Sequence, residues 1–333
     1  MIIRFGTFNL FQFCKPPYSW YIKKDKFNEE QWNKKTSWVK EQIEKMNCDI
    51  IGFQEVFSKE ELEYLCKDLG FKYFTTVDNP KIEKQTVYSS TVVALASKYP
   101  ILNTKKVNVH IPSIKKLDFK GKFSFSRIPI KALIELPNKT EITVYVNHFK
   151  SNRLNEFEYI FDKNTKLEEK KQKVKHALLN DYSPALKQRL IETSSLFFDF
   201  KKTKTPIVFL CDLNDKEYSL SIDALTNRTY HDEKKKFNSY LLFDSYLINT
   251  KEEYNPHPEK ETPRVSTSYF VDKGNVIDYI FLSKDFNKKD KNAIAEVSSY
   301  EIFDEHLQEN KNGSLIQSDH AQVVCEIDIY DCL

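Results

Sequence analysis

The chain has 333 residues, of which 40% are hydrophobic and 30% are charged, and its formal net charge is +3. This apolar content supports a substantial core and excludes an intrinsically disordered chain. Charges of both signs are mixed along the sequence, whereas a dedicated non-specific nucleic-acid binder carries a stronger basic excess.

Alternating apolar strands and amphipathic helices are predicted for the first half of the chain. The most regular helix is Glu29–Met46, in which Trp32, Val39 and Ile43 recur near helical spacing. A second helix closes at Gly70, a residue favoured just past a helix end. The expected elements are strands at 2–10, 49–56, 71–77, 89–97, 107–111, 123–136 and 140–147, a helix at 59–69 and a turn at 98–101.

The second half of the chain begins with a densely charged segment at residues 150–180. This segment lacks a long apolar face, so we expect a helix that is exposed or projects outward. A helix beginning at Pro184 follows it. The remaining expected elements are strands at 207–211, 276–282 and 322–329 and a short strand or helix near 239–247.

The order of these elements predicts the architecture. Strands and helices alternate at first, many strands follow, and neither a repeat nor a Gly/Ser-rich linker divides the chain. We therefore expect one α/β domain over residues 1–333, with two mixed sheets packed face to face and helices outside. A charged helical insertion is expected at about 150–185.

The cysteines and the N-terminal residues indicate in which cellular compartment the protein is located. The six cysteines form no CxxC pair, and we expect them to be reduced. Residues 1–5 are not a charged leader followed by an apolar region, and no apolar run approaches the length of a membrane span. We therefore expect a cytoplasmic protein without stable membrane insertion, and the sequence indicates no particular protein partner.

Polar side chains occur at the ends of most of the strongest predicted strands. The apolar run 207–210 leads into Asp212 and Asn214, whose side chains point to one face because strand side chains alternate. An Asp-x-Asn sequence is also typical of an Asx turn, but polar residues at so many strand ends favour a shared site. The residues with this placement are Asn9, Glu55, His148, Asp212, Asn214, Asp278 and the pair Asp319–His320.

These residue types indicate a class of chemistry. Carboxylate and carboxamide oxygens are ligands for hard cations such as Mg²⁺ or Mn²⁺, and no Cys/His cluster suited to zinc occurs. Imidazoles beside acidic groups act as general acids or bases, or they donate hydrogen bonds to phosphoryl oxygens. The sequence therefore predicts metal-assisted hydrolysis of a phosphate ester. The remaining histidines, at positions 110, 176, 231, 257 and 306, are expected at the surface.

Six motifs, in order, resemble those of the endonuclease/exonuclease/phosphatase superfamily. Its members include DNase I-like nucleases, abasic-site endonucleases, neutral sphingomyelinases and inositol polyphosphate phosphatases. The resemblance spans nearly the whole chain and implies a four-layer α/β sandwich of the DNase I-like type. The motifs are TFNL around Asn9, FQEV around Glu55, VNHFKS around His148, CDLN at 211–214, IDYIFLS around Asp278 and SDH at 318–320.

The resemblance implies a divalent cation in the site, Mg²⁺ or alternatively Mn²⁺. Carried over from the motifs, Glu55 would be the principal metal ligand. Asn9 and Asp319 would help to hold the metal or its waters.

The resemblance also implies catalytic roles for five residues. Asp212 would orient or deprotonate the attacking water, and Asn214 would hold that water or the phosphate. His320 would contact the scissile phosphate and stabilise its developing charge, while Asp278 would fix the imidazole ring. His148 would be a second imidazole near the leaving group.

Two further positions bear on the site. Arg127, within FSRIPI, resembles a basic residue that other members place near the substrate phosphate, although it could instead pair with a carboxylate in the sheet. Cys211 departs from the family, in which glycine usually precedes the Asp of Asp-x-Asn. We expect the Cys211 side chain to lie in the core, opposite to Asp212; a reachable thiol there would make the enzyme sensitive to oxidation.

The motifs define a reaction but leave the substrate open. A nuclease acting on DNA or RNA is favoured, with the basic loop at 113–127, the aromatic loop at 11–24 and the charged insertion as candidate contact surfaces. The alternative is a phosphatase or phospholipase C-like enzyme acting on inositol phosphates or sphingomyelin, for which the loop at 16–21 is a candidate apolar entry. A catalytically silent scaffold is disfavoured, because every key acid and histidine is present.

Overall fold

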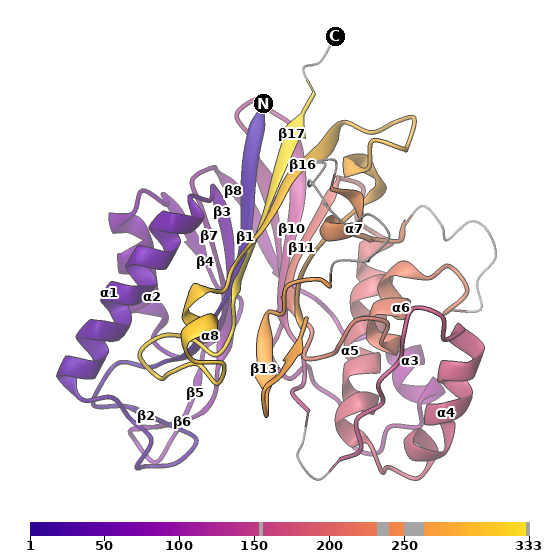
Figure 1. Cartoon of the computed structure of the whole chain (residues 1–333), viewed down its shortest axis with the longest axis horizontal. Coiled ribbons are helices and arrows are strands. Elements are labelled where there is room, and N and C mark those ends of the chain that lie inside the picture. The colour runs from indigo at the N-terminus through magenta and orange to yellow at the C-terminus, as the bar shows by residue number, and fades with distance from the viewer. Residues whose placement is uncertain (153–155, 232–239, 250–262, 331–333) are drawn as a thin grey trace.

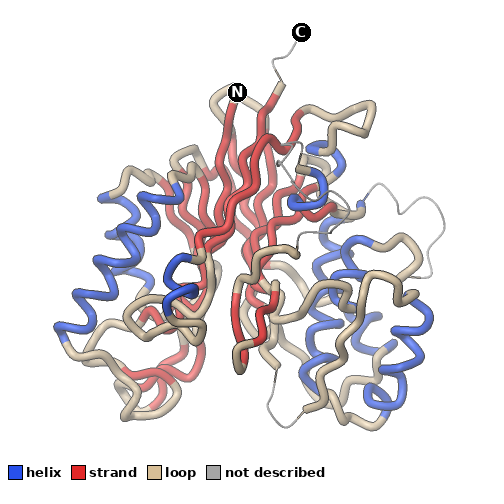
Figure 2. The backbone as a smooth tube through the Cα atoms, viewed as in Figure 1, coloured by secondary structure: helices blue, strands red, loops and turns tan. Residues whose placement is uncertain are grey.

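The computed structural model describes residues 1–152, 156–231, 240–249 and 263–330. Two six-stranded sheets pack face to face, and helices cover both outer faces (Figure 1 and Figure 2). Each sheet contains parallel and antiparallel neighbours. The predicted four-layer α/β sandwich is therefore confirmed.

Sheet one has the strand order β16-β17-β1-β3-β7-β4. Its central pair, β1 and β3, is parallel, and the other pairs are antiparallel. The bounds are β1 Ile2–Phe13, β3 Ile50–Val56, β4 Tyr73–Thr75, β7 Val92–Ser97, β16 Ala295–Phe303 and β17 Gln322–Ile329.

Sheet two has the strand order β12-β15-β11-β10-β9-β8, in which only β10 and β11 are parallel neighbours. Its bounds are β8 Ile101–Lys106, β9 Ile130–Glu135, β10 Glu141–His148, β11 Ile207–Asp212, β12 Phe243–Asp244 and β15 Asp278–Leu282. Short strands form a three-stranded sheet and a hairpin elsewhere: β2 Ser19–Trp20, β5 Lys81–Glu83, β6 Val87–Ser90, β13 Ser268–Phe270 and β14 Lys273–Asn275.

The helices pack in groups on the two sheets (Figure 1). Their bounds are α1 Glu29–Met46, α2 Lys59–Asp68, α3 Ile111–Lys116, α4 Leu167–Leu179, α5 Pro184–Phe200, α6 Leu220–Thr226, α7 Ser245–Ile248, α8 Glu305–Glu309 and the 3₁₀ turn η2 Lys284–Phe286. Helices α1 and α2 cover sheet one, and α5 and α6 cover sheet two. Within the described residues, no helix is both long and apolar enough to cross a membrane.

Helix α1 forms as its sequence predicts. Asn28 caps its first turn in a capping box with Gln31, in which each side chain accepts the backbone N–H of the other residue. Its apolar face, which includes Trp32 and Val39, packs with Phe53 of β3. The opposite face is charged and exposed, as expected for a helix that covers a sheet.

The core between the two sheets brings their strands unusually close at one point. A Cβ atom on Gly52 of β3 would lie 2.9 Å from a methyl carbon of Val146 in β10. Glycine at this position therefore permits the close approach of the two sheets. The adjoining apolar layer includes Ile50 of β3 and Leu210 of β11.

Some predicted elements were misplaced. The chain bends at 98–99, within the turn expected at 98–101, but strand β8 follows at 101–106, where no strand was predicted. Residues 107–110, expected as a strand, lie outside the strands, and helix α3 occupies 111–116. Of the strand expected at 123–136, only 130–135 form a strand, β9. Strand β16 was not predicted at all. Both β8 and β16 lie at sheet edges, where fewer side chains are buried and the apolar signal is weak.

The charged segment after β10 contains the expected helix, α4, but this helix does not project outward. Leu167, Val174 and Ala177 are buried, and α4 packs with α5 and α6. Lys170 completes this stripe, and its buried ammonium donates a hydrogen bond to Asp223 in α6 at 2.8 Å. This row of buried side chains is narrow, and the many charged residues around it make the apolar face of the helix difficult to recognise in the sequence.

Candidate active site

Neighbouring strands of sheet two bring three predicted site residues into one row. His148 ends β10, Asp212 ends β11 and Asp278 begins β15, and the pairing register places them side by side. Because side chains alternate along a strand, they point to the same face as Leu210 and Ile280, which lie in the core between the sheets. The row therefore forms the polar end of that core.

Asp212 is the centre of a hydrogen-bond network. Its Oδ2 accepts a hydrogen bond from Asn9 Nδ2 at 3.0 Å and lies 3.2 Å from His148 Nε2. Its Oδ1 accepts the backbone N–H of Asn214 at 2.8 Å, and a φ of 49° at Asn214 accompanies this tight turn. Groups from both sheets thus hold the carboxylate in one orientation.

His320 joins this row from sheet one, two residues before β17. Its Nδ1 lies 2.9 Å from Asp278 Oδ2. The Ser318 hydroxyl accepts the backbone N–H of His320 and donates to the backbone carbonyl of Asn9. One ligand atom from each of Asp212, Asp278 and His320 lies within 4.8 Å of the others. The two sheets therefore build one compact acid–imidazole cluster.

Backbone bulges determine where Glu55 lies. A φ of 59° at Glu55 and a register shift after Phe53 interrupt the regular alternation of β3. In β1, Phe11 and Gln12 also have positive φ, and the Gln12 N–H donates to Glu55 Oε2 at 3.0 Å. Such backbone conformations cost roughly 1–3 kcal/mol each and cluster at functional sites.

Burial and neighbouring charges give the ionisable groups very different pKa values. Burial raises the pKa of the Asp212 carboxyl to about 7, although the charge of His320 opposes this shift. Burial lowers the pKa of His320, but nearby carboxylates, Asp278 first, outweigh it and hold that pKa well above the usual value. Burial holds the pKa of His148 well below its usual value. At neutral pH the site therefore pairs a neutral imidazole with a protonated one.

Lys35 is a residue of this region that the sequence analysis missed. It lies in α1, is fully buried, and donates hydrogen bonds to the backbone carbonyls of Phe11 and Gln317. Burial lowers the pKa of Lys35 to about 7, while the charges of Asp319 and Glu55 oppose this shift. One lysine among many in an amphipathic helix carries no local signal that distinguishes it.

His306 was expected at the surface, but it is only 6% exposed. Its Nε2 lies 3.0 Å from the backbone oxygen of His320, and its ring makes an edge contact with Trp38. His306 therefore supports the segment that carries His320. Of the other histidines expected at the surface, His176 is exposed, His110 and His231 are half-buried, and His257 lies outside the described residues.

Arg127 contacts the backbone beside the cluster. Its Nη1 donates to the carbonyl oxygen of Phe149 at 3.0 Å, and Asn214 Nδ2 donates to the same oxygen at 3.2 Å. This shared acceptor ties the residue after His148 to the Asp-x-Asn turn. Arg127 thus lies near the predicted site and supports its backbone.

A cavity of about 490 Å³ opens beside the cluster, and Asn214, Asp319 and His320 contribute to its wall. This volume is within the roughly 300–1,000 Å³ typical of small-molecule sites. The β13–β14 hairpin forms another part of the wall and is bridged to His320 through Ser268. The wall also includes Phe157, Tyr269, Phe270, Lys216, Arg189, Glu156 and Glu158.

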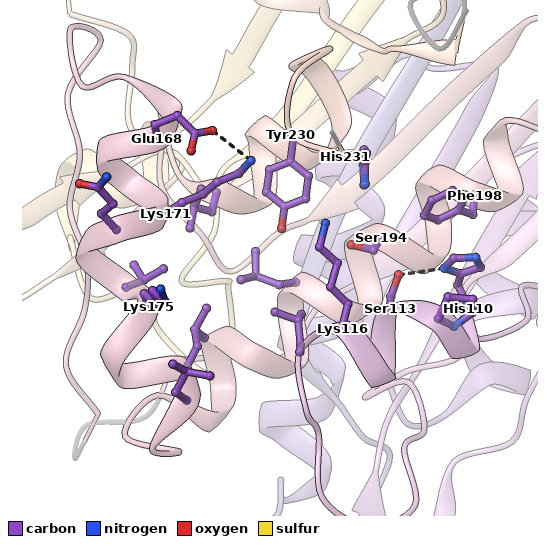
Figure 3. A pocket seen from close by; sticks show the side chains of 18 residues that line it. His110, Ser113, Lys116, Glu168, Lys171, Lys175, Ser194, Phe198, Tyr230 and His231 are labelled. Atoms are coloured by element: carbon purple, nitrogen blue, oxygen red, sulfur yellow. Dashed lines mark hydrogen bonds and ion pairs between the residues drawn. The ribbon is translucent and has the colours of Figure 1, made fainter. Parts of the chain in front are cut away.

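Two of the expected contact surfaces contribute no described residue to the cavity beside His320, although Arg127 of the basic loop contacts the backbone next to the site. Lys116, from the basic loop at 113–127, lines a different cavity, which lies between α3, α4 and α5 (Figure 3). Trp20, from the aromatic loop at 11–24, is buried and packs on Phe27. Of the three expected surfaces, only the charged insertion contributes described residues to the cavity beside His320, among them Phe157.

The oxygen donors of this site fit a hard divalent cation. Asp319 Oδ1 and Asp278 Oδ1 are buried oxygens without a hydrogen-bond partner among the described residues. Burial and the charge of Glu55 raise the pKa of Asp319 to about 6, a cost that a bound cation would offset. Asn9 is already engaged, because its Oδ1 accepts the N–H of Phe11 and its Nδ2 donates to Asp212.

Cys211 lies in the core, as its position in the strand predicts. It is fully buried in the apolar cluster behind sheet two, and its Sγ lies 3.6 Å from the backbone oxygen of Tyr279. Burial raises the pKa of this thiol well above its usual value. Cys211 is therefore shielded from reagents that attack thiolates.

Several solved structures share this fold. The human nocturnin catalytic domain with bound sulfate matches with 14% identity and a TM-score of 0.56, covering 99% of this chain and 95% of that one. An AP endonuclease from Archaeoglobus fulgidus matches with 14% identity and a TM-score of 0.52, covering 98% and 100%. TDP2 from D. rerio complexed with a single-strand DNA product matches with 9% identity and a TM-score of 0.53, covering 98% and 99%. At these identities the likeness shows the shared fold.

The family itself follows from the sequence match. The model of the Endonuclease/Exonuclease/phosphatase family matches residues 6–320, and the chain belongs to this family. Its members are hydrolases that act on phosphoester bonds, and they typically use divalent metals. A search of curated proteins finds no match.

Proposed function

We propose that this protein is a divalent-metal-dependent phosphodiesterase that cleaves nucleic acid, with Mg²⁺ as its cation and Mn²⁺ as a substitute. The observation that carries the proposal is the cluster of Asp212, Asp278 and His320 beside an open cavity. An oriented carboxylate and a protonated imidazole supply a general base and a stabiliser of phosphoryl charge.

Asp212 is the proposed general base. The raised pKa of its carboxyl lies close to neutrality, which suits a group that must accept a proton from water. His148 and Asn9 contact its Oδ2 and fix the direction of the carboxylate. In this proposal the proton of the attacking water moves to Asp212 as the water oxygen bonds to phosphorus. The bond from phosphorus to the leaving oxygen breaks in the same reaction, and the leaving oxygen takes up a proton from solvent.

His320 is the proposed partner of the phosphoryl group. Asp278 engages its Nδ1, so that Nε2 remains to donate a hydrogen bond to a phosphoryl oxygen. The charge that develops on the phosphoryl oxygens is then stabilised by an imidazolium. Asn214, which lines the same cavity, is proposed to position the phosphate or the water, and Arg127 adds positive charge nearby.

Glu55, Asp319 and Asn9 are the residues proposed to hold the cation. The two carboxylates supply oxygen donors, and Asn9 contributes through a lone pair of its carbonyl or through a bound water. When bound, the cation would polarise the phosphoryl oxygens and neutralise their charge.

The cavity wall favours a nucleic-acid substrate. Phe157, Tyr269 and Phe270 offer aromatic faces on which nucleic-acid bases can stack. Each stacking contact contributes roughly 1–3 kcal/mol to the free energy of binding. The basic residues of the wall are already paired, Lys216 with Glu158 and Arg189 with a neighbouring Asp. Recognition by stacking on a short single-stranded segment therefore suits this wall better than tracking of a long phosphate backbone.

One observation favours a second candidate, a phospholipase C-like enzyme or phosphatase acting on sphingomyelin or an inositol phosphate. The tip of the β13–β14 hairpin exposes Phe270 by 59% and Val271 by 71%. Apolar residues exposed beside a catalytic cavity suit contact with a lipid surface. A catalytically silent scaffold is the third possibility that the experiments below distinguish.

A hydrolysis panel tests the proposal. The purified protein is incubated with single-stranded DNA, RNA, plasmid DNA, sphingomyelin vesicles and inositol phosphates, each with Mg²⁺, Mn²⁺ or EDTA. We expect cleavage of single-stranded DNA or RNA that requires the cation and falls only moderately with salt, because the paired basic residues of the wall neutralise few phosphates. Cleavage of only the lipid or inositol substrates would replace the nucleic-acid proposal, and inactivity on every ester would favour the scaffold.

Matched variants test the site within the same panel. Asp212→Ala and His320→Ala should each abolish detectable hydrolysis, whereas Asp118→Ala and His176→Ala, which change exposed residues, should not. Tyr269→Ala should raise KM for nucleic acid, and Tyr64→Ala, on the exposed face of α2, should leave it unchanged. Full activity in Asp212→Ala and His320→Ala would refute the assigned site.

We also propose a reducing, cytoplasmic location and a single domain for the chain. The five cysteines that the structure describes are all free and buried, which is common for proteins that never meet an oxidising compartment. Labelling with a fluorescent tag and fractionation of cells would check the compartment. Limited proteolysis that yields two stable fragments would contradict the single domain.

A further inference from the structure

Lys35 carries a buried ammonium group that the proposed mechanism does not use. It lies in α1, is fully buried, and its Nζ donates hydrogen bonds to the backbone carbonyls of Phe11 and Gln317. Burial of a charged group costs free energy, and an apolar side chain of similar length would avoid that cost. The two carbonyls that the ammonium contacts therefore indicate its role.

The first contact orients the peptide group that holds Glu55. The carbonyl of Phe11 and the N–H of Gln12 belong to one trans peptide group, so they point in opposite directions. Lys35 donates to this carbonyl at 3.0 Å, and the N–H on the other side donates to Glu55 Oε2 at 3.0 Å. Phe11 and Gln12 both have positive φ, an uncommon conformation that requires support from its surroundings. Lys35 therefore helps to fix the direction of a hydrogen bond to a proposed metal ligand.

The second contact holds the segment that carries Asp319. Gln317 precedes Asp319 by two residues, and its carbonyl accepts the other hydrogen bond of Lys35. The residue between them, Ser318, donates its hydroxyl to the backbone carbonyl of Asn9 at 2.8 Å. The segment before β17 is thus tied to both α1 and β1. Lys35 joins this segment to the β1 bulge across a large separation in sequence.

These contacts leave carboxylate oxygen available to a cation. The ammonium lies close enough to Asp319 and Glu55 to interact with their charges. Its hydrogen bonds nevertheless go to carbonyl oxygens, and Asp319 Oδ1 is buried without a hydrogen-bond partner among the described residues. Lys35 therefore holds the backbone from which the carboxylates project without occupying that oxygen.

We propose that Lys35 is a positioning residue for the cation site, which sets the spacing between Glu55 and Asp319; this inference rests on the proposed function. Spacing matters most for Mg²⁺, which demands near-ideal octahedral geometry at about 2.0–2.1 Å, whereas Ca²⁺ accepts flexible geometry at about 2.3–2.6 Å. Lys35 therefore favours Mg²⁺ over a larger cation. A purely electrostatic role would have the opposite sign, because removal of a positive charge would strengthen the binding of any cation.

Cation binding in the absence of substrate tests the proposal. Mn²⁺ is titrated into metal-free protein, its free fraction is measured by electron paramagnetic resonance, and Mg²⁺ or Ca²⁺ is then used to displace it. In Lys35→Met, we expect the dissociation constant of Mg²⁺ to rise roughly 10- to 100-fold and that of Ca²⁺ to rise by no more than about threefold. Tighter or unchanged binding of Mg²⁺ would overturn the proposal. An equal loss for both cations would also overturn it, because general loosening of the fold would explain that result.

A neighbouring lysine provides the matched control. Lys34→Met removes the charge of an exposed residue of α1 and should change neither dissociation constant. Melting temperatures show whether each variant is folded. If Lys35→Met is not folded, Lys35→Gln, whose shorter amide side chain also removes the charge, decides by the same comparison.

The cation titration and the hydrolysis panel fail in different ways. A wild-type protein that binds cations but hydrolyses no ester would overturn the proposed function and leave the positioning role in place. Wild-type binding that Lys35→Met leaves unchanged would overturn only the positioning role. A wild-type protein that binds no cation would overturn both.

Discussion

His320 Nδ1 lies 2.9 Å from Asp278 Oδ2, and this contact joins the start of β15 in sheet two to the segment before β17 in sheet one. The two residues are 42 positions apart and belong to different layers of the sandwich. Packing of the two sheets therefore determines the orientation and charge of the imidazole. Any displacement of one sheet relative to the other would separate the pair.

The first prediction concerns this pair. Asp278→Asn keeps the shape of the side chain but removes the charge that raises the pKa of His320. We expect kcat to fall roughly 10²- to 10⁴-fold and the high-pH limb of the activity profile to move to lower pH. Asp199→Asn, which alters an Asp bonded to Lys131 and Tyr145 away from the cavity, is the control. An unshifted pH profile in Asp278→Asn would contradict the proposed link.

The second prediction concerns the pH dependence of the wild-type enzyme. Asp212 must be unprotonated to act as a base, and the pKa of its carboxyl is raised to about 7, so activity should fall as pH decreases through neutrality. His320 must be protonated, and its pKa is raised, so activity should fall again at alkaline pH. We expect a bell-shaped kcat/KM, measured from about pH 5 to 10. Raising Mg²⁺ should move the acidic limb to lower pH, because a cation favours the carboxylate.

The third prediction concerns Lys35. Its folded-state pKa is lowered to about 7, so the unfolded chain binds more protons between that pH and the usual lysine value. Stability should therefore rise with pH across this window, with a slope of up to about 1.4 kcal/mol per pH unit. Urea unfolding of the metal-free protein should lose this slope in Lys35→Met and retain it in Lys34→Met, which removes an exposed neighbour. Equal slopes in both variants would contradict the lowered pKa of the buried Lys35.

The fourth prediction concerns the thiols. Burial raises the pKa values of Cys14, Cys48, Cys66, Cys211 and Cys325. In a Cys332→Ser background, we expect the native protein to react with an aromatic disulfide reagent only on the timescale of unfolding. Peroxide should likewise leave activity unchanged over minutes. Rapid loss of activity that is prevented by Cys211→Ala would show that this thiol is reachable.

Much of the fold could be predicted from local patterns. The helix at Glu29–Met46 and the strand at Gln322–Ile329 begin and end where the apolar periodicity predicts. Strand β16 was missed, because an edge strand buries too little apolar surface to be distinguished from a loop. Helix α4 was correctly predicted as a helix, but its packing against the domain was not predicted. The row of buried side chains that holds it in place is too short to be recognised in the sequence.

The sequence by itself determined the residue types of the candidate site and the order in which they occur. Asp212 and Asn214 follow an apolar strand, and the motifs around Glu55 and His320 complete the family pattern. These features are local, because a strand end and a short motif involve only neighbouring residues.

Only the tertiary structure decided which groups meet and what charge they carry. Asp278 contacts His320, and Lys35 lies near Asp319, through the packing of elements that are distant in sequence. Burial and mutual electrostatic interaction set the pKa values of these groups, and both depend on the complete fold. The cavity between α3, α4 and α5 likewise exists only because these helices pack around it.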